Sequence, residues 1–267
     1  MDFPRPSVRS NPRYALACFI SLLFLSFISD SALAKEDSLV FGVISSLNMP
    51  FAETEQKDGG MVAKRGLLIG MADQLAKELG RTPVNKVISR SLVVSSLMNG
   101  SVDVVCYTTP QWMGIPATNV KWSDSFVENN DILISRAGVA EILVMDDMSG
   151  KTIGTVKHYN YPLLEPLFNS GKVTRLDSSS EKANFMQLLK ASKIEAITLN
   201  ELTFTYLYNK YFDPEKFPIV QHSLIMEFVQ PQCAISRHSD VTASAFNVAL
   251  NKLKAVGFID NYLKKVQ

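Results

Sequence analysis

The fold is indicated most clearly by residues 100–126, which read GSVDVVCYTTPQWMGIPATNVKWSDSF. Gly100 ends a helical stretch, the apolar run Val102–Tyr107 indicates a buried strand, and a polar, aromatic loop containing Trp112 follows. In open α/β sheets the carboxyl ends of the strands face the crevice where ligands bind. We therefore expect this loop to form part of a binding site.

Two strand–helix pairs precede this stretch. Apolar runs indicate strands at Leu39–Ile44 and Pro83–Ser89, and apolar residues at helical spacing predict helices over Leu67–Leu79 and Leu92–Leu97. This alternation is typical of an α/β sheet, and right-handed crossovers bring the carboxyl ends of its strands to one edge. Candidate ligand contacts near that edge are one cation, one hydroxyl and three aromatic rings: Phe51, Arg90, Tyr107, Thr109 and Trp112.

A second α/β unit is predicted over roughly residues 138–225. Its strands and helices alternate at Ile142–Met145, Thr152–Val156, Leu163–Phe168, Val173–Leu176, Ala183–Ala191 and Ile194–Leu199. Two of these strands are followed by polar or aromatic residues ahead of a helix, a position suited to anions and other ligands. The candidate contacts there are His158, Tyr159, Tyr161, Asn200 and Glu201.

The end of the chain contains a predicted strand at Phe228–Arg237 and a predicted helix over Val241–Val256. These elements have no core of their own, so we expect them to pack on the first unit. The chain then crosses between the two units twice, near residues 127–138 and near residues 224–230.

Each candidate contact also has a purely structural interpretation. Trp112 could cover the edge of the core, and Arg90 could belong to a surface salt bridge. Phe51 and Tyr107 could pack within their unit. Glu201 could be a helix-start carboxylate that the helix dipole favours.

Composition excludes several classes of protein. The chain has 267 residues, of which 46% are apolar and 20% charged, with a formal net charge of +1. This length suits one large or two modest domains, and the charge balance gives no basic surface for nucleic acid. The three histidines are scattered and no Cys-x-x-Cys spacing occurs, so the sequence predicts neither a metal site nor a cofactor.

The N-terminus has the pattern of a secretory signal peptide. Three arginines precede the apolar run Tyr14–Ile28, and Ala32-Leu33-Ala34 forms a small-x-small cleavage site. We expect residues 1–34 to be removed, which leaves Cys106 and Cys233 in an oxidising compartment. A membrane anchor, or lipidation at Cys18, is the alternative.

Several short motifs occur in an order that resembles the extracellular solute-binding proteins of family 3, the polar-amino-acid class that serves ABC importers. They are Met49-Pro50-Phe51, Asp73-Gln74-Leu75-Ala76, Leu97–Asp103, Trp122–Phe126, Asp146–Gly154 and Leu250–Tyr262. The resemblance implies a two-lobed periplasmic-binding-protein fold of type II, with two α/β lobes joined by two crossing strands that close on a ligand. Residues 35–130 and 229–267 would form lobe 1, and residues 131–228 would form lobe 2.

The ligand anchors of the family are altered in this sequence. Amino-acid binders of the family hold the ligand's carboxylate with an arginine after the third strand, whereas no arginine occurs between Arg90 and Arg136 and Trp112 stands at that motif position. The family's aspartate for the ligand's amino group aligns with Asn200. The fold also implies that the returning strand lies antiparallel beside the third strand, so Cys106 and Cys233 would be neighbours. They would form either a disulfide or a pair of buried thiols.

The resemblance implies a monomeric periplasmic protein that captures a small polar or aromatic solute and delivers it to the membrane subunits of an ABC importer. One alternative is an enzyme on the same scaffold, similar to the family's dehydratases, with Glu201 or His158 as general base. Another is a ligand-sensing module for a membrane partner. The sequence favours binding, because it contains no evident pair of nucleophile and base.

Overall fold

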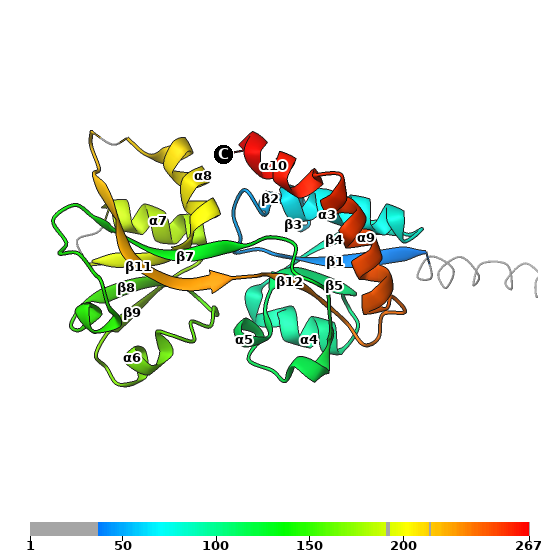
Figure 1. Cartoon of the computed structure of the whole chain (residues 1–267), viewed down its shortest axis with the longest axis horizontal. Helices are drawn as coiled ribbons and strands as arrows, with labels where there is room; N and C mark the ends of the chain where they lie inside the picture. The colour runs from blue at the N-terminus through cyan, green and yellow to red at the C-terminus, as the bar shows by residue number, and fades with distance from the viewer. Residues whose placement is uncertain (1–36, 191–192, 214, 267) are drawn as a thin grey trace, which may run out of the picture. The chain divides into compact units, whose positions relative to one another are not determined.

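The computed structural model describes residues 37–190, 193–213 and 215–266. Two five-stranded sheets with helices on their faces organise this part of the chain, which confirms the predicted two-lobed α/β fold (Figure 1). Both lobes belong to one compact unit that begins at Leu39. The predicted signal peptide, residues 1–34, lies outside the described residues. Within those residues, no helix combines the length and the apolar character that a membrane span requires.

The first lobe is built on a sheet with the strand order β4-β1-β5-β12-β6. Its strands are β1 (Ser38–Ile44), β4 (Thr82–Ile88), β5 (Val104–Thr108), β6 (Lys121–Trp122) and β12 (Gln232–Ile235). Strand β5 is parallel to β1 and antiparallel to β12, as expected for a strand that returns from the other lobe.

Helices cover both faces of this sheet. On one side lie α3 (Leu67–Glu78), α9 (Ala243–Ala255) and α10 (Phe258–Val266), which contact one another. On the other side lie α4 (Val93–Met98), which the 3₁₀ helix η1 (Arg90–Leu92) precedes, and the short α5 (Pro110–Met113) (Figure 1). Together they bury a single continuous apolar cluster.

The second lobe is built on a sheet with the strand order β11-β7-β10-β8-β9. Its elements are β7 (Asn129–Arg136), β8 (Thr152–Val156), α6 (Glu165–Asn169), β9 (Thr174–Ser178), α7 (Glu181–Lys190), β10 (Ala196–Asn200), α8 (Glu201–Tyr211) and β11 (Ile219–Val229). Alternate residues of β7 belong to different apolar clusters, Ile132 and Ile134 to one and Leu133 to the other. Since successive side chains of a strand point to opposite faces, this lobe has a separate core on each side of its sheet.

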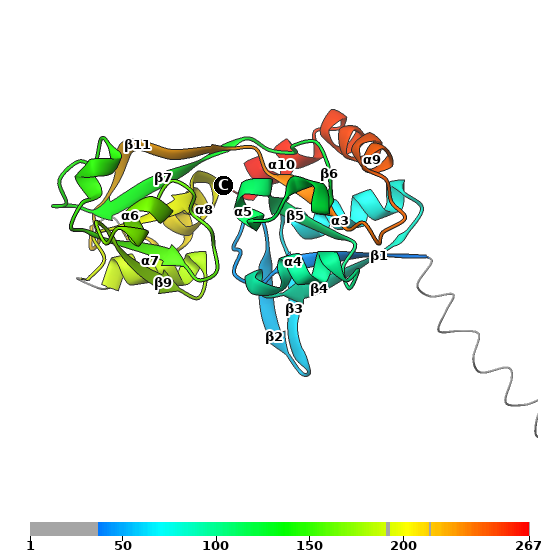
Figure 2. The same ribbon diagram turned by 90° about the horizontal axis from the view of Figure 1, so that it is seen from below.

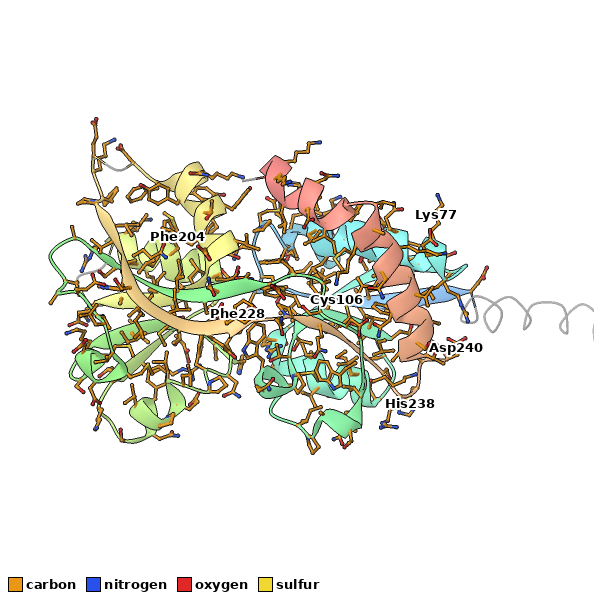
Figure 3. All side chains as sticks on the ribbon, viewed as in Figure 1. Lys77, Cys106, Phe204, Phe228, His238 and Asp240 are labelled. Atoms are coloured by element: carbon orange, nitrogen blue, oxygen red, sulfur yellow. A yellow bond between two sulfur atoms is a disulfide. The ribbon has the colours of Figure 1, made fainter. Side chains whose placement is uncertain are left out.

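The chain passes from the first sheet to the second after β6, and it returns between β11 and β12. Cys106 on β5 and Cys233 on β12 are register partners, and a disulfide joins them. Figure 3 labels Cys106 near the point where β11 gives way to β12. The bridge therefore ties the returning strand to the centre of the first sheet.

A β-hairpin that the sequence analysis did not identify lies between β1 and α3. It consists of β2 (Glu53–Lys57) and β3 (Gly60–Arg65), and it projects from the first lobe (Figure 2). Gly59 and Gly60 at its turn have positive φ angles of 97° and 142°, which glycine adopts without a steric penalty. Its strands are mostly polar, so the alternation of apolar residues that marks a half-buried strand is missing.

The strand predicted at Ile142–Met145 is wrong, because the first three of its residues have no regular structure and a 3₁₀ helix, η3 (Met145–Met148), follows. The backbone amide of Ile142 donates to Nδ1 of His222, and the amides of Leu143 and Val144 donate to the carboxylate of Asp147. These side chains accept the hydrogen bonds that the backbone amides would donate to a neighbouring strand in a sheet.

The strand predicted at Phe228–Arg237 is two strands, since β11 ends at Val229 and β12 begins at Gln232. Pro231 lies in the interruption and has no N–H to donate to a ladder. Most of β11 was not predicted from the sequence, and helix α8 was indicated only as a possible helix start at Glu201. Helix α8 is rich in β-branched and aromatic residues, which are weak helix formers.

Candidate functional site

A cavity of about 60 Å³ is lined by side chains from both lobes and from the strands next to the crossings. Pockets for drug-sized ligands measure ~300–1,000 Å³, so this cavity suits a small solute. Its lining includes these residues predicted from the sequence: Arg90, Tyr107, Trp112, Tyr159, Tyr161 and Asn200.

Aromatic rings from the first lobe form one wall. Tyr107, at the end of β5, has a φ of 63°, which is rare for a bulky residue, and its ring centroid lies 3.8 Å from that of Phe51. The ring centroid of Trp112 lies 6.0 Å from that of Tyr107. Trp112 is positioned by α5, because its backbone amide donates to Oγ1 of Thr109, the N-cap of that helix.

Arg90 is the positive group of the cavity. It lies at the start of η1, just after β4, and its Nη2 donates to the carbonyl oxygen of Trp112 over 2.8 Å. Its guanidinium lies 5.6 Å from the ring centroid of Tyr159. Among the ion pairs between described residues, none includes Arg90. Burial lowers the pKa of Arg90, as expected for a cation with little water and no anionic partner.

Three carboxylates line the cavity as well, and the sequence analysis identified none of them. Asp131 on β7 and Glu227 on β11 are register partners, so their side chains leave the same face of the sheet. Glu181 is the first residue of α7 and is 5% exposed. Within the described residues, the ion pairs include none of these three side chains.

Burial raises the pKa of two of these carboxyl groups. The pKa of Asp131 rises to about 7, opposed by a hydrogen bond from Asn200 and reinforced by the charge of Glu227. The pKa of Glu181 rises to about 8, reinforced by Asp131 and opposed by hydrogen bonds from Asn48 and Thr203. Each pKa is raised because the charged form has lost water and gained no cation.

Asn200, at the end of β10, is hydrogen-bonded to one of these acidic groups, Asp131. Its Oδ1 accepts from the amide of Leu202, which caps α8, and its Nδ2 donates to Oδ1 of Asp131 over 3.3 Å. The Nδ2 group also donates to Oδ1 of Asn129. Asn200 therefore orients the Asp131 carboxylate from the neighbouring strand.

The two tyrosines after β8 line the cavity from the second lobe. Ser46 Oγ, from the first lobe, donates to the hydroxyl oxygen of Tyr159 over 3.2 Å. The hydroxyl oxygen of Tyr161 accepts from the backbone amide of Val156 over 2.9 Å. Nearby, Nδ2 of Asn160 donates to the carbonyl oxygen of Gln111. The two lobes thus contact each other directly at the cavity.

Four of the predicted contacts do not line the cavity. Phe51 is fully buried behind Tyr107, and Thr109 is buried as the N-cap of α5. His158 is exposed and lines a neighbouring hollow that also includes Arg90 and Trp112. Glu201 accepts a hydrogen bond from Asn130 and lies outside the cavity lining.

A signal for one of the missed carboxylates was present in the sequence. Asp131 directly precedes the apolar run Ile132-Leu133-Ile134 of β7, and a charge next to a buried run indicates a binding site or a paired group. Glu181 resembles an ordinary helix-start acid. Glu227 belongs to β11, which the sequence did not reveal as a long strand.

No protein-family model matches the chain, and no curated protein matches it. Among solved structures, the substrate-binding protein of an amino acid ABC transporter is 20% identical, with a TM-score of 0.68, over 86% of this chain and 98% of its own. An amino acid ABC transporter substrate-binding protein from Streptococcus pneumoniae, bound to L-arginine, is 18% identical, with a TM-score of 0.69, over 88% and 96%.

A third similar structure is an ancestral amino-acid-binding protein described as a precursor of cyclohexadienyl dehydratase. It is 18% identical, with a TM-score of 0.66, over 88% of this chain and 97% of its own. At these identities the likeness shows the fold. The chain has the two-lobed α/β fold of periplasmic binding proteins, and its structural neighbours are substrate-binding proteins of amino acid ABC transporters.

Proposed function

We propose that this protein captures a small, amino-acid-like solute in the cavity between its lobes and delivers it to the membrane subunits of an ABC importer. The observation that carries the proposal is Arg90, a half-buried guanidinium that faces the cavity without an anionic partner among the described residues. A buried charge is costly unless it is paired, so Arg90 is suited to an anionic group of the ligand.

Arg90 contacts the segment after β5 in which the family's motif is altered. Trp112 stands where the resembled family has its carboxylate-binding arginine, and the Trp112 carbonyl accepts a hydrogen bond from Arg90. Arg90 therefore extends from the end of β4 toward the region that the family's arginine would serve. In this proposal the anion anchor has moved from the third strand to the second, and Trp112 supplies an aromatic surface beside it.

Two features favour a periplasmic binding protein. The Cys106–Cys233 disulfide suits an oxidising compartment, in agreement with the predicted signal peptide at residues 1–34. The structural neighbours named above are substrate-binding proteins of ABC transporters. We extend transport from those proteins to this chain as part of the proposal.

An enzyme on the same scaffold is less favoured. That alternative assigned the general base to Glu201 or His158, and neither residue lines the cavity. A general base must lie within hydrogen-bond reach of the proton that it removes. A sensing protein would bind its ligand in the same cavity. Only an experiment therefore distinguishes a sensing role from transport.

The experiment is a thermal-shift screen of the mature chain, residues 35–267, against amino acids, amines and small organic acids. A ligand at 100 times its Kd stabilises a protein by about 2.7 kcal/mol, which such a screen detects. We expect a ligand with an anionic group to bind and Arg90→Met to weaken it at least tenfold. Arg136→Met is the matched control, since Arg136 lies outside the cavity lining. Unchanged affinity of Arg90→Met would refute the anchor.

Transport is tested in cells that lack the protein. Uptake of the labelled ligand should fall to background and return when the wild-type gene is restored. Normal uptake, combined with loss of a ligand-dependent response, would instead support the sensing role.

A further inference from the structure

We propose that the ligand carries a net positive charge, and that its cationic nitrogen is held by the carboxylates of Asp131, Glu181 and Glu227. This inference rests on the proposed binding function and specifies the class of solute. It also identifies three contact residues that the sequence analysis did not find.

The first argument is the balance of charge in the cavity. One guanidinium, that of Arg90, and three carboxylates line it, and none of the four belongs to an ion pair among the described residues. Once the three carboxyl groups are ionised, an anionic group on the ligand would neutralise Arg90 and leave the carboxylates without a partner. A ligand that matches the whole lining therefore needs more positive than negative charge.

The second argument is the arrangement of these carboxylates around one region. Asp131 and Glu227 stand side by side on β7 and β11, and Glu181 lies near enough for the charge of Asp131 to affect its ionisation. Asn200 holds one oxygen of Asp131, and the indole Nε1 of Trp112 donates to Oε2 of Glu227 over 3.2 Å. These bonds orient both side chains and leave their other oxygens free to accept from an ammonium or guanidinium group.

The third argument concerns the kind of cation. In the described part of the chain, no group of three or more metal-ligating side chains could hold a metal ion. The cavity that these carboxylates line is also lined by the aromatic residues Tyr107, Trp112, Tyr159 and Tyr161. Aromatic faces attract organic cations through their quadrupoles. The chemistry therefore suits a protonated amine or a guanidinium.

Binding of such a cation should depend on pH. In the ligand-free protein burial raises the pKa of Asp131 to about 7 and that of Glu181 to about 8. The charged and titratable groups that face them are Glu227, Arg90, Tyr107, Tyr159 and Tyr161. A bound cation favours the ionised carboxylates, so binding releases protons and affinity rises with pH up to about 8.

The experiment is isothermal titration calorimetry of the mature protein with four probes: putrescine, L-arginine, L-glutamine and L-glutamate. We expect L-arginine to bind, and putrescine to bind more weakly because it has no carboxylate for Arg90, each with affinity at least tenfold higher at about pH 8.5 than at about pH 6. Titration at about pH 7 in two buffers of different ionisation enthalpy should show proton release. This second measurement needs no variant.

Two isosteric variants locate the interaction. Asp131→Asn and Glu181→Gln should each reduce affinity for the cation at least tenfold and weaken its pH dependence. Asp124→Asn is the matched control, because Asp124 is exposed and lies outside the cavity lining. Circular dichroism spectra of all variants verify that they fold.

Binding of only L-glutamine or L-glutamate, or of none of the four probes, overturns the inference. So does cation binding that releases no protons and survives both substitutions. The proposed function fails separately, when no solute of any charge in the wider screen stabilises the protein.

Discussion

The two lobes are built from the same alternation of strands and helices, but different interactions stabilise the interior of each lobe. The first lobe has one continuous apolar cluster and a disulfide between its central strands. The second lobe has a separate cluster on each side of its sheet, with an edge strand, β11, whose pairing with β7 is irregular. Burial raises the pKa of Asp131 and of Glu181, and both residues belong to the second lobe. Covalent closure thus stabilises one lobe, whereas buried acids make the stability of the other depend on pH.

The largest expected effect is that of removing the disulfide with Cys106→Ala and Cys233→Ala. The two cysteines are 127 residues apart, and closing so long a loop is worth about 4–5 kcal/mol in the chain-entropy model. Denaturant unfolding should show a lower midpoint for the double variant, and reductant should shift the wild type alone. If unfolding occurs in two steps, only the step of the first lobe should move. Equal midpoints in oxidised protein and variant would contradict this.

The second prediction concerns the buried acids of the second lobe. The unfolded chain loses the protons of Asp131 and Glu181 near their ordinary pKa values of 3.8 and 4.5, whereas the folded protein retains them to about 7 and 8. Stability of the ligand-free protein should therefore fall as the pH rises from about 4 to about 8.

Calorimetry over this pH range provides the measurement. The double variant Asp131→Asn with Glu181→Gln should show a flatter dependence of Tm on pH than the wild type. Identical slopes for the two proteins would mean that neither carboxyl group has a raised pKa.

A smaller effect is expected for Trp112→Ala, which removes an aromatic ring from the first lobe's side of the cavity. Loss of that ring, and of its bond to Glu227, should reduce ligand affinity about tenfold, or about 1.4 kcal/mol. The matched control is Trp122→Ala, because Trp122 donates to the Ala117 carbonyl and lies outside the cavity lining. If both variants bind as the wild type does, Trp112 only covers the core.

The smallest effect is expected at Thr109, the N-cap of α5. Thr109→Val removes the hydroxyl that accepts from the Trp112 amide and should cost about 1 kcal/mol of stability. Thr109→Ser keeps this oxygen and serves as the control, with an unfolding midpoint close to that of the wild type. The prediction fails if serine and valine lower the midpoint equally.

The site was only partly predictable from the sequence. Arg90, Tyr107 and Trp112 were predicted because they lie at or just after the carboxyl ends of strands of the first lobe, which share one edge of the sheet. Phe51 and Thr109 were predicted for the same reason, but they do not line the cavity. The ring of Phe51 packs against that of Tyr107, and Thr109 accepts a hydrogen bond from the amide of Trp112. The rule locates the edge of the sheet, and it does not specify which side chains reach the cavity.

The sequence by itself determined the two α/β units, because apolar runs and helical spacing are local patterns that arise wherever a strand or helix buries one face. It also determined that the chain carries two cysteines beyond the predicted signal peptide. It did not reveal the β2–β3 hairpin or the full length of β11, where polar and apolar residues follow no clear period.

Only the tertiary structure decided that Asp131, Glu181 and Glu227 share a cavity with Arg90. Their positions are separated by up to 137 residues (227 − 90) and belong to four different elements. A carboxylate has the same local pattern whether water or a protein cavity surrounds it. Its pKa and its lack of a cationic partner depend on which strands and helices pack around it, and that packing is a property of the folded chain.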